Sequence, residues 1–335
     1  MIDIEKSKLN IENMFVHRSK KHKHKSDKLI EKILVKALKR AETHDVILYQ
    51  SYHIALMDNA KYLSDSEFDK NINWYIDLVE FHDDVSKSIK RVRPSYSKMP
   101  DRSFISTAYL FADHFYNYET GANYLGNKTF TAMWRFKQNA KKALRYKRRG
   151  KRKKAMQALL YACHFLADMN QPHHVGNQID RRGKLVSFLE KKLKLDGIVH
   201  GVFSNHSEFE GLVKRWIKNR DRIKLLLGED SKEVFLLDSV PTSGASYDYL
   251  MEENSEIFYR KSDKEKIEYL YNKNKDLNLD EFCEYIGRES AKYAVQFVDD
   301  ANKHGSKEQV IATVKALNMT EIQLARFLYY FCNLK

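Results

Sequence analysis

Long segments with apolar residues at helical spacing run through most of this sequence. Residues 153–169, KKAMQALLYACHFLADM, are an example, and the pattern stops at Pro172. The chain has 335 residues but only 4 prolines and 12 glycines, which favours long helices with few tight turns. The two-residue alternation that marks a half-buried strand does not occur. The sequence therefore predicts an all-α fold, a single compact multi-helix bundle.

The same spacing predicts the order of the helices and the organisation of the chain. Helices are expected at 29–38, 46–63 with Thr43 as N-cap, 69–91 before Pro94, 131–146 and 153–169 as a hairpin around Gly150, 206–227, 279–303 and 320–334. Residues 1–27 are polar and predict a basic, flexible N-terminal segment. Residues 28–303 would form the helical domain, and residues 304–335 a C-terminal helical extension.

The charge of the chain points to anionic partners. The formal net charge is +14, and basic residues cluster in KKHKHK (20–25) and YKRRGKRKK (146–154). Such a surface suits acidic lipid headgroups, nucleic acid or another phosphorylated substrate; a solvated loop that only aids solubility is the alternative for 146–154. No run approaches the roughly 20 apolar residues of a membrane span. The N-terminus lacks the apolar region of a secretory signal, so we expect a cytoplasmic protein.

Histidines and carboxylates recur four residues apart on the predicted helices. His164 and Asp168 form one such pair, and His206 and Glu210 form another. Residues four apart share a helix face, so each pair can point at one cation. His174 follows just past the proline that ends the first of these helices. Neutral imidazoles mixed with carboxylates suit zinc, whereas the 3 cysteines lack metal-binding spacing.

These motifs, in this order, resemble those of the bacterial zinc-dependent phospholipases C, a family that includes the phosphatidylcholine-preferring enzymes and the catalytic domain of the alpha-toxins. The family signature His-Tyr-x-Gly-Asp followed by x-x-x-Pro-x-His is similar to His164–Asp168 with Pro172 and His174. Further matches are His206 with Glu210, Asp113–Tyr116, Pro100–Asp101 and Thr43–His44. The resemblance covers roughly residues 40 to 303. It implies an all-helical domain with zinc ions lining the bottom of a cleft.

The resemblance also implies a ligand set. One zinc would be held by Asp101, His114, His164 and Asp168, a second by His174, His206 and Glu210, and a third by His44 with Asp168 bridging. Asp101 is further implied as the general base for the attacking water; Asp83 and Asp84 are alternatives that lie farther from His114. Zinc lowers the pKa of a water that it binds to roughly 7. Attack on phosphorus would then release diacylglycerol and a phosphorylated headgroup.

Two departures from the family pattern bear on the metal count and on the substrate. The family completes its third zinc site with an N-terminal tryptophan, but this chain has no tryptophan before Trp74. We therefore expect two or three zinc ions. If there are three, a histidine from residues 17–24 would replace the tryptophan as ligand of the third. Choline-preferring members carry an aromatic residue directly after the base aspartate, where this chain has Arg102. A cation there would prefer an anionic group to choline, while Phe111 occupies the second aromatic position of the headgroup pocket.

Three functions follow from these observations. The leading one is a zinc-dependent phosphodiesterase of phospholipase C type, acting on a phospholipid or membrane surface that is anionic. A single-strand-type zinc nuclease is the first alternative, although such nucleases usually carry His-x-x-x-Asp where this chain has His206 and Glu210. The second alternative is a non-catalytic lipid-binding relative. Residues 185–195, LVSFLEKKLKL, predict an added helix, either an ordinary packing insert or a membrane-contacting flap.

Overall fold

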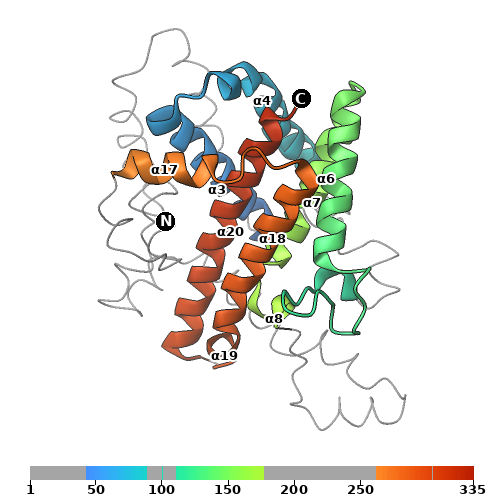
Figure 1. Ribbon diagram of the computed structural model, residues 1–335, viewed down its shortest axis with the longest axis vertical. Helices are drawn as coiled ribbons and strands as arrows, with labels where there is room; N and C mark the ends of the chain where they lie inside the picture. The colour runs from blue at the N-terminus through green and yellow to red at the C-terminus, as the bar shows by residue number, and fades with distance from the viewer. Residues whose placement is uncertain (1–42, 89–99, 101–110, 177–261, 304) are drawn as a thin grey trace.

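In the computed structural model, the described part of the chain consists of helices joined by turns and loops (Figure 1). The structure describes residues 43–88, 100, 111–176, 262–303 and 305–335. Within these ranges there is no β-strand, which confirms the predicted all-α class. The helices predicted at 29–38, 185–195 and 206–227 lie outside the described residues.

Most of the predicted helices begin and end near the expected residues. The first described helix, α3 (Thr43–Asp58), continues into one π-helical turn, η1 (Asn59–Leu63). In chain order the others are α4 (Ser66–Ser88), the 3₁₀ turn η4 (Ala112–His114), α6 (Ala132–Arg148), α7 (Arg152–Asp168), α8 (Pro172–Val175), α17 (Asp263–Asn272), α18 (Leu279–Ala294), η6 (Val295–Phe297), α19 (Val298–Ala301) and α20 (Lys307–Asn333). None of the described helices is long and apolar enough to cross a membrane.

The predicted hairpin of α6 and α7 is confirmed, and its caps explain its bounds. Thr131 N-caps α6 by accepting a hydrogen bond from the backbone N–H of Trp134 at 3.1 Å. The turn between the helices passes through Gly150 at φ 64°, a left-handed conformation that glycine adopts without steric cost. α7 ends at Asp168, before Pro172. The hairpin therefore carries the sequence pair His164 and Asp168 on the last turns of its second arm.

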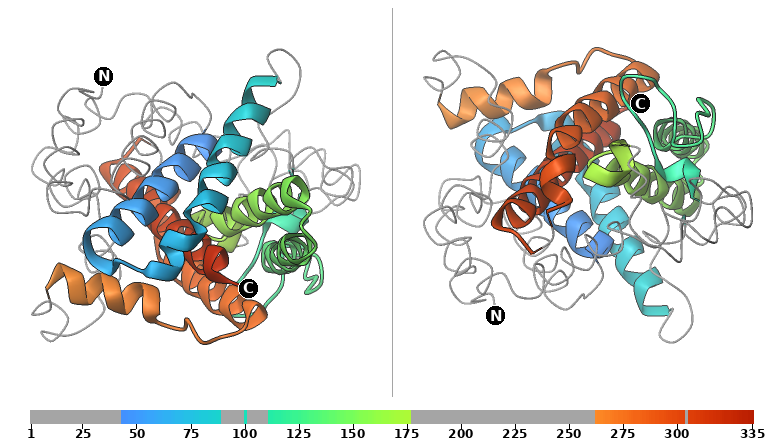
Figure 2. Two further views of the ribbon diagram at one scale, coloured as in Figure 1. Left: turned by 90° about the horizontal axis from the view of Figure 1, so that it is seen from above. Right: turned by 90° about the horizontal axis from the view of Figure 1, so that it is seen from below.

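The C-terminal helix α20 lies in the middle of the bundle, where it packs against α3, α4, α7, α17, α18 and α19 (Figure 1). Figure 2 shows α20 crossing the centre of the molecule when it is seen from above. We expected residues 320–334 to be helical and residues 304–335 to form an extension. The helix begins earlier, at Lys307, and nearly all its residues from Ala312 to Cys332 are buried. Its position is central rather than peripheral.

A buried polar network joins α20 to α18. Arg326 on α20 is 2% exposed, and its Nη1 lies 2.6 Å from Glu289 Oε2 on α18. Gln323 donates a second hydrogen bond to Glu289, at 2.8 Å, and Tyr285 donates a third, at 2.6 Å. Burial raises the pKa of Glu289, but the Arg326 charge and these hydrogen bonds outweigh it and hold that pKa at about 2. The carboxylate is thus fully ionised inside the bundle.

Candidate metal centre

Four histidines and one aspartate that are distant in the sequence meet at one end of the α6–α7 hairpin. They come from four elements: His44 from α3, His114 from η4, His164 and Asp168 from α7, and His174 from α8. His114, His164, Asp168 and His174 are each at most 5% exposed. The structure thus brings together His164, Asp168 and His174, the described residues to which the spacing argument applied.

The end of α7 explains how His174 returns to the cluster. Gln171 follows the last turn of α7 and N-caps α8, accepting a hydrogen bond from the backbone N–H of His174 at 2.8 Å. Pro172 occupies the first turn of α8, where its missing N–H costs nothing. The chain reverses there, and His174 Nδ1 comes to lie 3.3 Å from Asp168 Oδ1. The helix end at Pro172 therefore places His174 next to Asp168.

His114 reaches the cluster from the loop that precedes α6. Phe111, at φ 60°, begins the 3₁₀ turn that holds His114. The segment is tied on both sides: the N–H of Tyr116 donates to the carbonyl of His174 at 3.1 Å, and the N–H of Ala132 donates to the carbonyl of Phe115, also at 3.1 Å. The loop is therefore anchored to α8 and to the start of α6.

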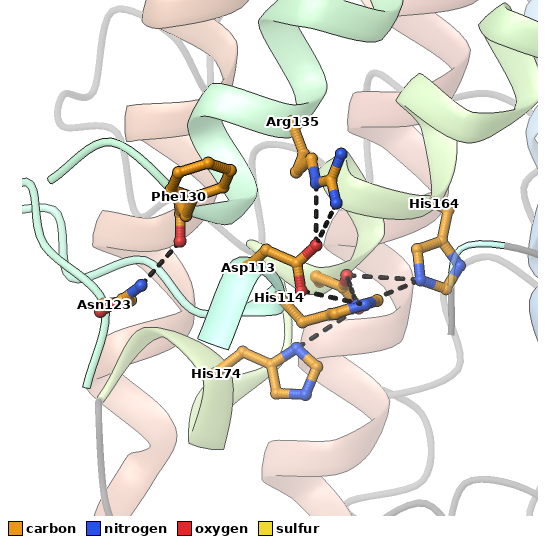
Figure 3. Close-up of polar contacts among 8 residues, drawn as sticks. Asp113, His114, Asn123, Phe130, Arg135, His164 and His174 are labelled. Carbon is orange, nitrogen blue, oxygen red and sulfur yellow. Dashed lines mark hydrogen bonds and ion pairs between the residues drawn. The ribbon is translucent and has the colours of Figure 1, made fainter. Parts of the chain in front are cut away.

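Figure 3 shows the side chains of His114, His164 and His174 close together. Each has a ring nitrogen within 3.5 Å of the carboxylate of Asp168. His114 Nδ1 lies 2.8 Å from Asp168 Oδ2, and His164 Nε2 lies 3.5 Å from the same oxygen. The two ring nitrogens are 3.3 Å apart. His174 instead faces the other oxygen, Oδ1. Oδ2 of Asp168 thus lies close to His114 and His164, and Oδ1 lies close to His174.

These distances suit a metal ion that takes nitrogen and oxygen ligands. Zinc lies about 2.0–2.2 Å from such ligands in tetrahedral sites, so two of its ligand atoms are about 3.3 Å apart. The distances between the facing atoms of His114, His164 and Asp168 are 2.8, 3.3 and 3.5 Å. Within the described residues, this trio forms a group able to hold a metal ion. The donor set fits zinc, which accepts imidazole and carboxylate together.

The electrostatics of the cluster favour an ionised carboxylate. Burial by itself raises the pKa of Asp168, because a charged group loses hydration there. His164, His114 and His174 act in the opposite direction, and a hydrogen bond from His114 adds to them. Together they hold the pKa of Asp168 well below its usual range. Asp168 is therefore the anionic centre of the cluster.

Two predicted site residues, His44 and Phe111, have rings close to those of His164 and His114. The ring of His44 is 4.5 Å from the ring of His164, measured between centroids. The ring of Phe111 is 5.9 Å from that of His114. Left-handed backbone is costly for a bulky residue, of order 1–3 kcal/mol, and such strain clusters at functional sites. Phe111 is thus held at the edge of the cluster by the 3₁₀ turn that it begins.

The remaining predicted site residues lie outside the described part of the chain. They are Asp101, Arg102, His206 and Glu210. Their roles as general base, headgroup contact and second-zinc ligands stay predictions.

Sequence reasoning missed the side chains that surround these histidines. Asp113 is completely buried, and Arg135 on α6 donates to it from Nε at 2.8 Å. His173 Nε2 lies 3.1 Å from Asn302 Oδ1, which joins α8 to the residue that follows α19. The sequence does show Asp113 directly before His114. Its pairing with Arg135, 22 positions away, has no local pattern that could have revealed it.

Comparisons with known proteins give a family match and similar solved structures. The family model for zinc dependent phospholipase C matches residues 96–296. Among solved structures, the chain is similar to the alpha toxin from Clostridium absonum, with a TM-score of 0.58 and 17% identity over 87% of this chain and 63% of the toxin chain. It is also similar to the alpha-toxin of Clostridium perfringens from avian strain SWCP, with a TM-score of 0.53 and 17% identity over 87% of this chain and 62% of that chain.

The likeness to the toxins concerns the fold. At 17% identity the two structures share an architecture with this chain, which spans less than two thirds of their length. No curated protein sequence matches the chain.

Proposed function

The chain belongs to the zinc-dependent phospholipase C family, and on that basis we propose that it hydrolyses a phospholipid to diacylglycerol and a phosphorylated headgroup. One observation supports the proposal most: His114, His164 and Asp168 come together, buried, at distances that suit a zinc ion. Zinc bound there would supply an ionisable water near neutral pH and positive charge beside the phosphodiester.

The chain's own residues have separable roles in this proposal. His114 and His164 present ring nitrogens to one oxygen of Asp168, and His174 faces the other oxygen. A carboxylate whose two oxygens face different groups can serve two ions, as the resemblance implies for Asp168 between the first and the third zinc. We assign His114, His164 and Asp168 to one ion and His174 to a second, with His44 at a third site if the protein holds three.

Positioning of the substrate would fall to residues at the edge of the cluster. Phe111 offers an aromatic face next to His114, and Arg102 would favour an anionic headgroup over choline. Asp101 would accept the proton of the attacking water as general base. Burial of the cluster limits the access of bulk water, so charges in it act more strongly on the phosphate than they would in solvent.

The exposed end of the α6–α7 hairpin supports an anionic membrane surface as the partner. It carries six exposed basic residues: Arg148, Arg149, Lys151, Arg152, Lys153 and Lys154. Each such residue near an anionic bilayer contributes about 1 kcal/mol. The first helical residue, Arg152, and Asp168 stand at opposite ends of α7, about 24 Å apart along its axis. The basic surface therefore serves attachment to lipid and lies apart from the metal centre.

Hydrolysis of phospholipid vesicles tests the proposed function. We expect release of phosphorylated headgroup from vesicles, faster with phosphatidylglycerol than with phosphatidylcholine because of the positive charge of the protein. Prolonged dialysis against a chelator should abolish the release, and added zinc should restore it. Raised salt should lower binding to the anionic vesicles because it screens the basic surface.

Chelation, nucleic-acid degradation and vesicle binding separate the alternatives. Hydrolysis that survives the chelator would contradict a metal-dependent enzyme. Degradation of single-stranded DNA or RNA with zinc, without hydrolysis of lipid, would replace the phospholipase with a nuclease. Tight binding to anionic vesicles without hydrolysis of any phosphodiester would identify a non-catalytic lipid-binding protein.

A further inference from the structure

Asp113 directly precedes His114 in the chain, and Figure 3 shows the two side chains next to each other. His114 turns Nδ1 toward Asp168 and His164, so this nitrogen is the one that would bind zinc. Its other ring nitrogen, Nε2, lies 3.8 Å from Asp113 Oδ1. The imidazole is therefore placed between two carboxylates, one in the cluster and one behind it.

Arg135 determines which oxygen of Asp113 faces the ring. Two of its guanidinium nitrogens, Nε at 2.8 Å and Nη2 at 2.7 Å, donate to the same oxygen, Oδ2. Oδ1 is consequently the oxygen turned toward His114. The separation of 3.8 Å exceeds an ordinary N–H···O distance by about 0.8 Å, which a small rotation of the ring or of the carboxylate closes.

Arg135 is itself held in place. Its guanidinium carbon lies 5.7 Å from the ring centroid of Trp134 and 5.8 Å from that of Phe165. Its side chain is 16% exposed, and the Asp113 side chain is 0% exposed. A buried ion pair of this kind is weak evidence for stability, because removing both charges from water costs as much as their attraction returns. We therefore look for the role of the Asp113–Arg135 pair in the orientation of His114 rather than in the stability of the fold.

We propose that Asp113 and Arg135 are positioning residues: when His114 Nδ1 exchanges its hydrogen bond to Asp168 for the metal, they keep the remaining ring proton on Nε2. Arg135 aligns Asp113, and Asp113 Oδ1 accepts a hydrogen bond from the Nε2–H of His114. The inference rests on the proposed metal centre and gives a role to two residues outside the predicted ligand set. Outer partners of this type commonly contribute 10–100-fold to metal affinity.

Zinc affinity of matched variants tests this proposal. Competition with a chromogenic chelator measures the dissociation constant of zinc for the full-length protein. We expect Asp113→Asn and Arg135→Gln to weaken zinc binding about 10–100-fold, because the amide of asparagine can present its NH₂ group to His114 and favour the wrong tautomer. Arg135→Lys should recover part of the loss, since lysine keeps the charge but not the two-pronged contact.

Lys141→Gln is the matched control. Lys141 lies on the same helix and pairs with Asp280 at 2.6 Å on a surface away from the cluster, so zinc affinity should not change. If the wild-type protein binds no zinc, the proposed function fails. If wild type binds zinc and Asp113→Asn binds it equally well, the positioning role alone is overturned.

Nitrogen chemical shifts of the His114 ring in the zinc-loaded wild-type protein provide a readout that does not depend on folding of the variants. A proton on Nε2 is the expected result. A proton on Nδ1 would overturn the assignment.

Discussion

Asp168→Asn is expected to remove zinc binding and phospholipid hydrolysis together. Asp168 lies within 3.5 Å of ring nitrogens of His114, His164 and His174, so it is the charged group common to all of them. The substitution keeps the shape of the side chain but removes its charge. We expect hydrolysis to fall at least about 100-fold, since loss of a ligand should exceed the 10–100-fold cost of losing an outer partner.

Chelator competition and headgroup release from vesicles measure the two effects of Asp168→Asn. The exposed aspartate Asp276 provides the control, and Asp276→Asn should leave zinc affinity and hydrolysis unchanged. Circular dichroism checks that both variants keep their helices. Full hydrolysis by a folded Asp168→Asn variant would contradict the placement of the metal.

Arg326→Ala is expected to cause the largest loss of stability, about 3–5 kcal/mol. The substitution leaves the Glu289 carboxylate, whose side chain is 9% exposed, without its arginine partner in the interior. It also removes the hydrogen bond from Arg326 to Gln323, at 2.9 Å. Urea unfolding monitored by circular dichroism measures the change. Lys141→Ala removes an ion pair whose lysine side chain is 45% exposed, and should cost less than about 1 kcal/mol.

The pH dependence of unfolding gives an independent check on the same pair. The pKa of Glu289 is about 2 in the folded protein, against an ordinary value of 4.5. A lowered carboxylate pKa stabilises the fold above pH 4.5, and this contribution is lost as the pH falls through 4.5 toward 2, by up to about 3 kcal/mol. Arg326→Ala should flatten this part of the profile, because the charge that lowers the pKa is gone. An unchanged profile would show that other groups hold Glu289 ionised.

Sequence patterns indicate the proximity of site residues where their spacing along the chain is local. His164 and Asp168 share a helix face because they are four positions apart, and His174 returns because Pro172 ends α7. For His44 and His114 no spacing pattern points to the cluster, and only the family resemblance implies their roles as ligands. The structure places both beside His164, at ring-centroid distances of 4.5 and 5.2 Å.

What the sequence did not predict depends on contacts between distant segments. Arg135 and Asp113 belong to different elements, and neither lies in a repeating pattern with the other. The central position of α20 was missed for a related reason. That helix buries Gln323 and Arg326, and polar residues of this kind normally indicate a solvent-facing side. Their hydrogen bonds to Glu289 offset the cost of removing these polar groups from water. Glu289 lies on α18, so no pattern within α20 reveals these bonds.

Zinc-edge anomalous diffraction from crystals of the purified protein tests the central claim most directly. The account predicts a zinc peak about 2.0–2.2 Å from His114 Nδ1, His164 Nε2 and Asp168 Oδ2. A zinc-loaded crystal whose only peaks lie elsewhere, with His114 Nδ1 still hydrogen-bonded to Asp168, would contradict it.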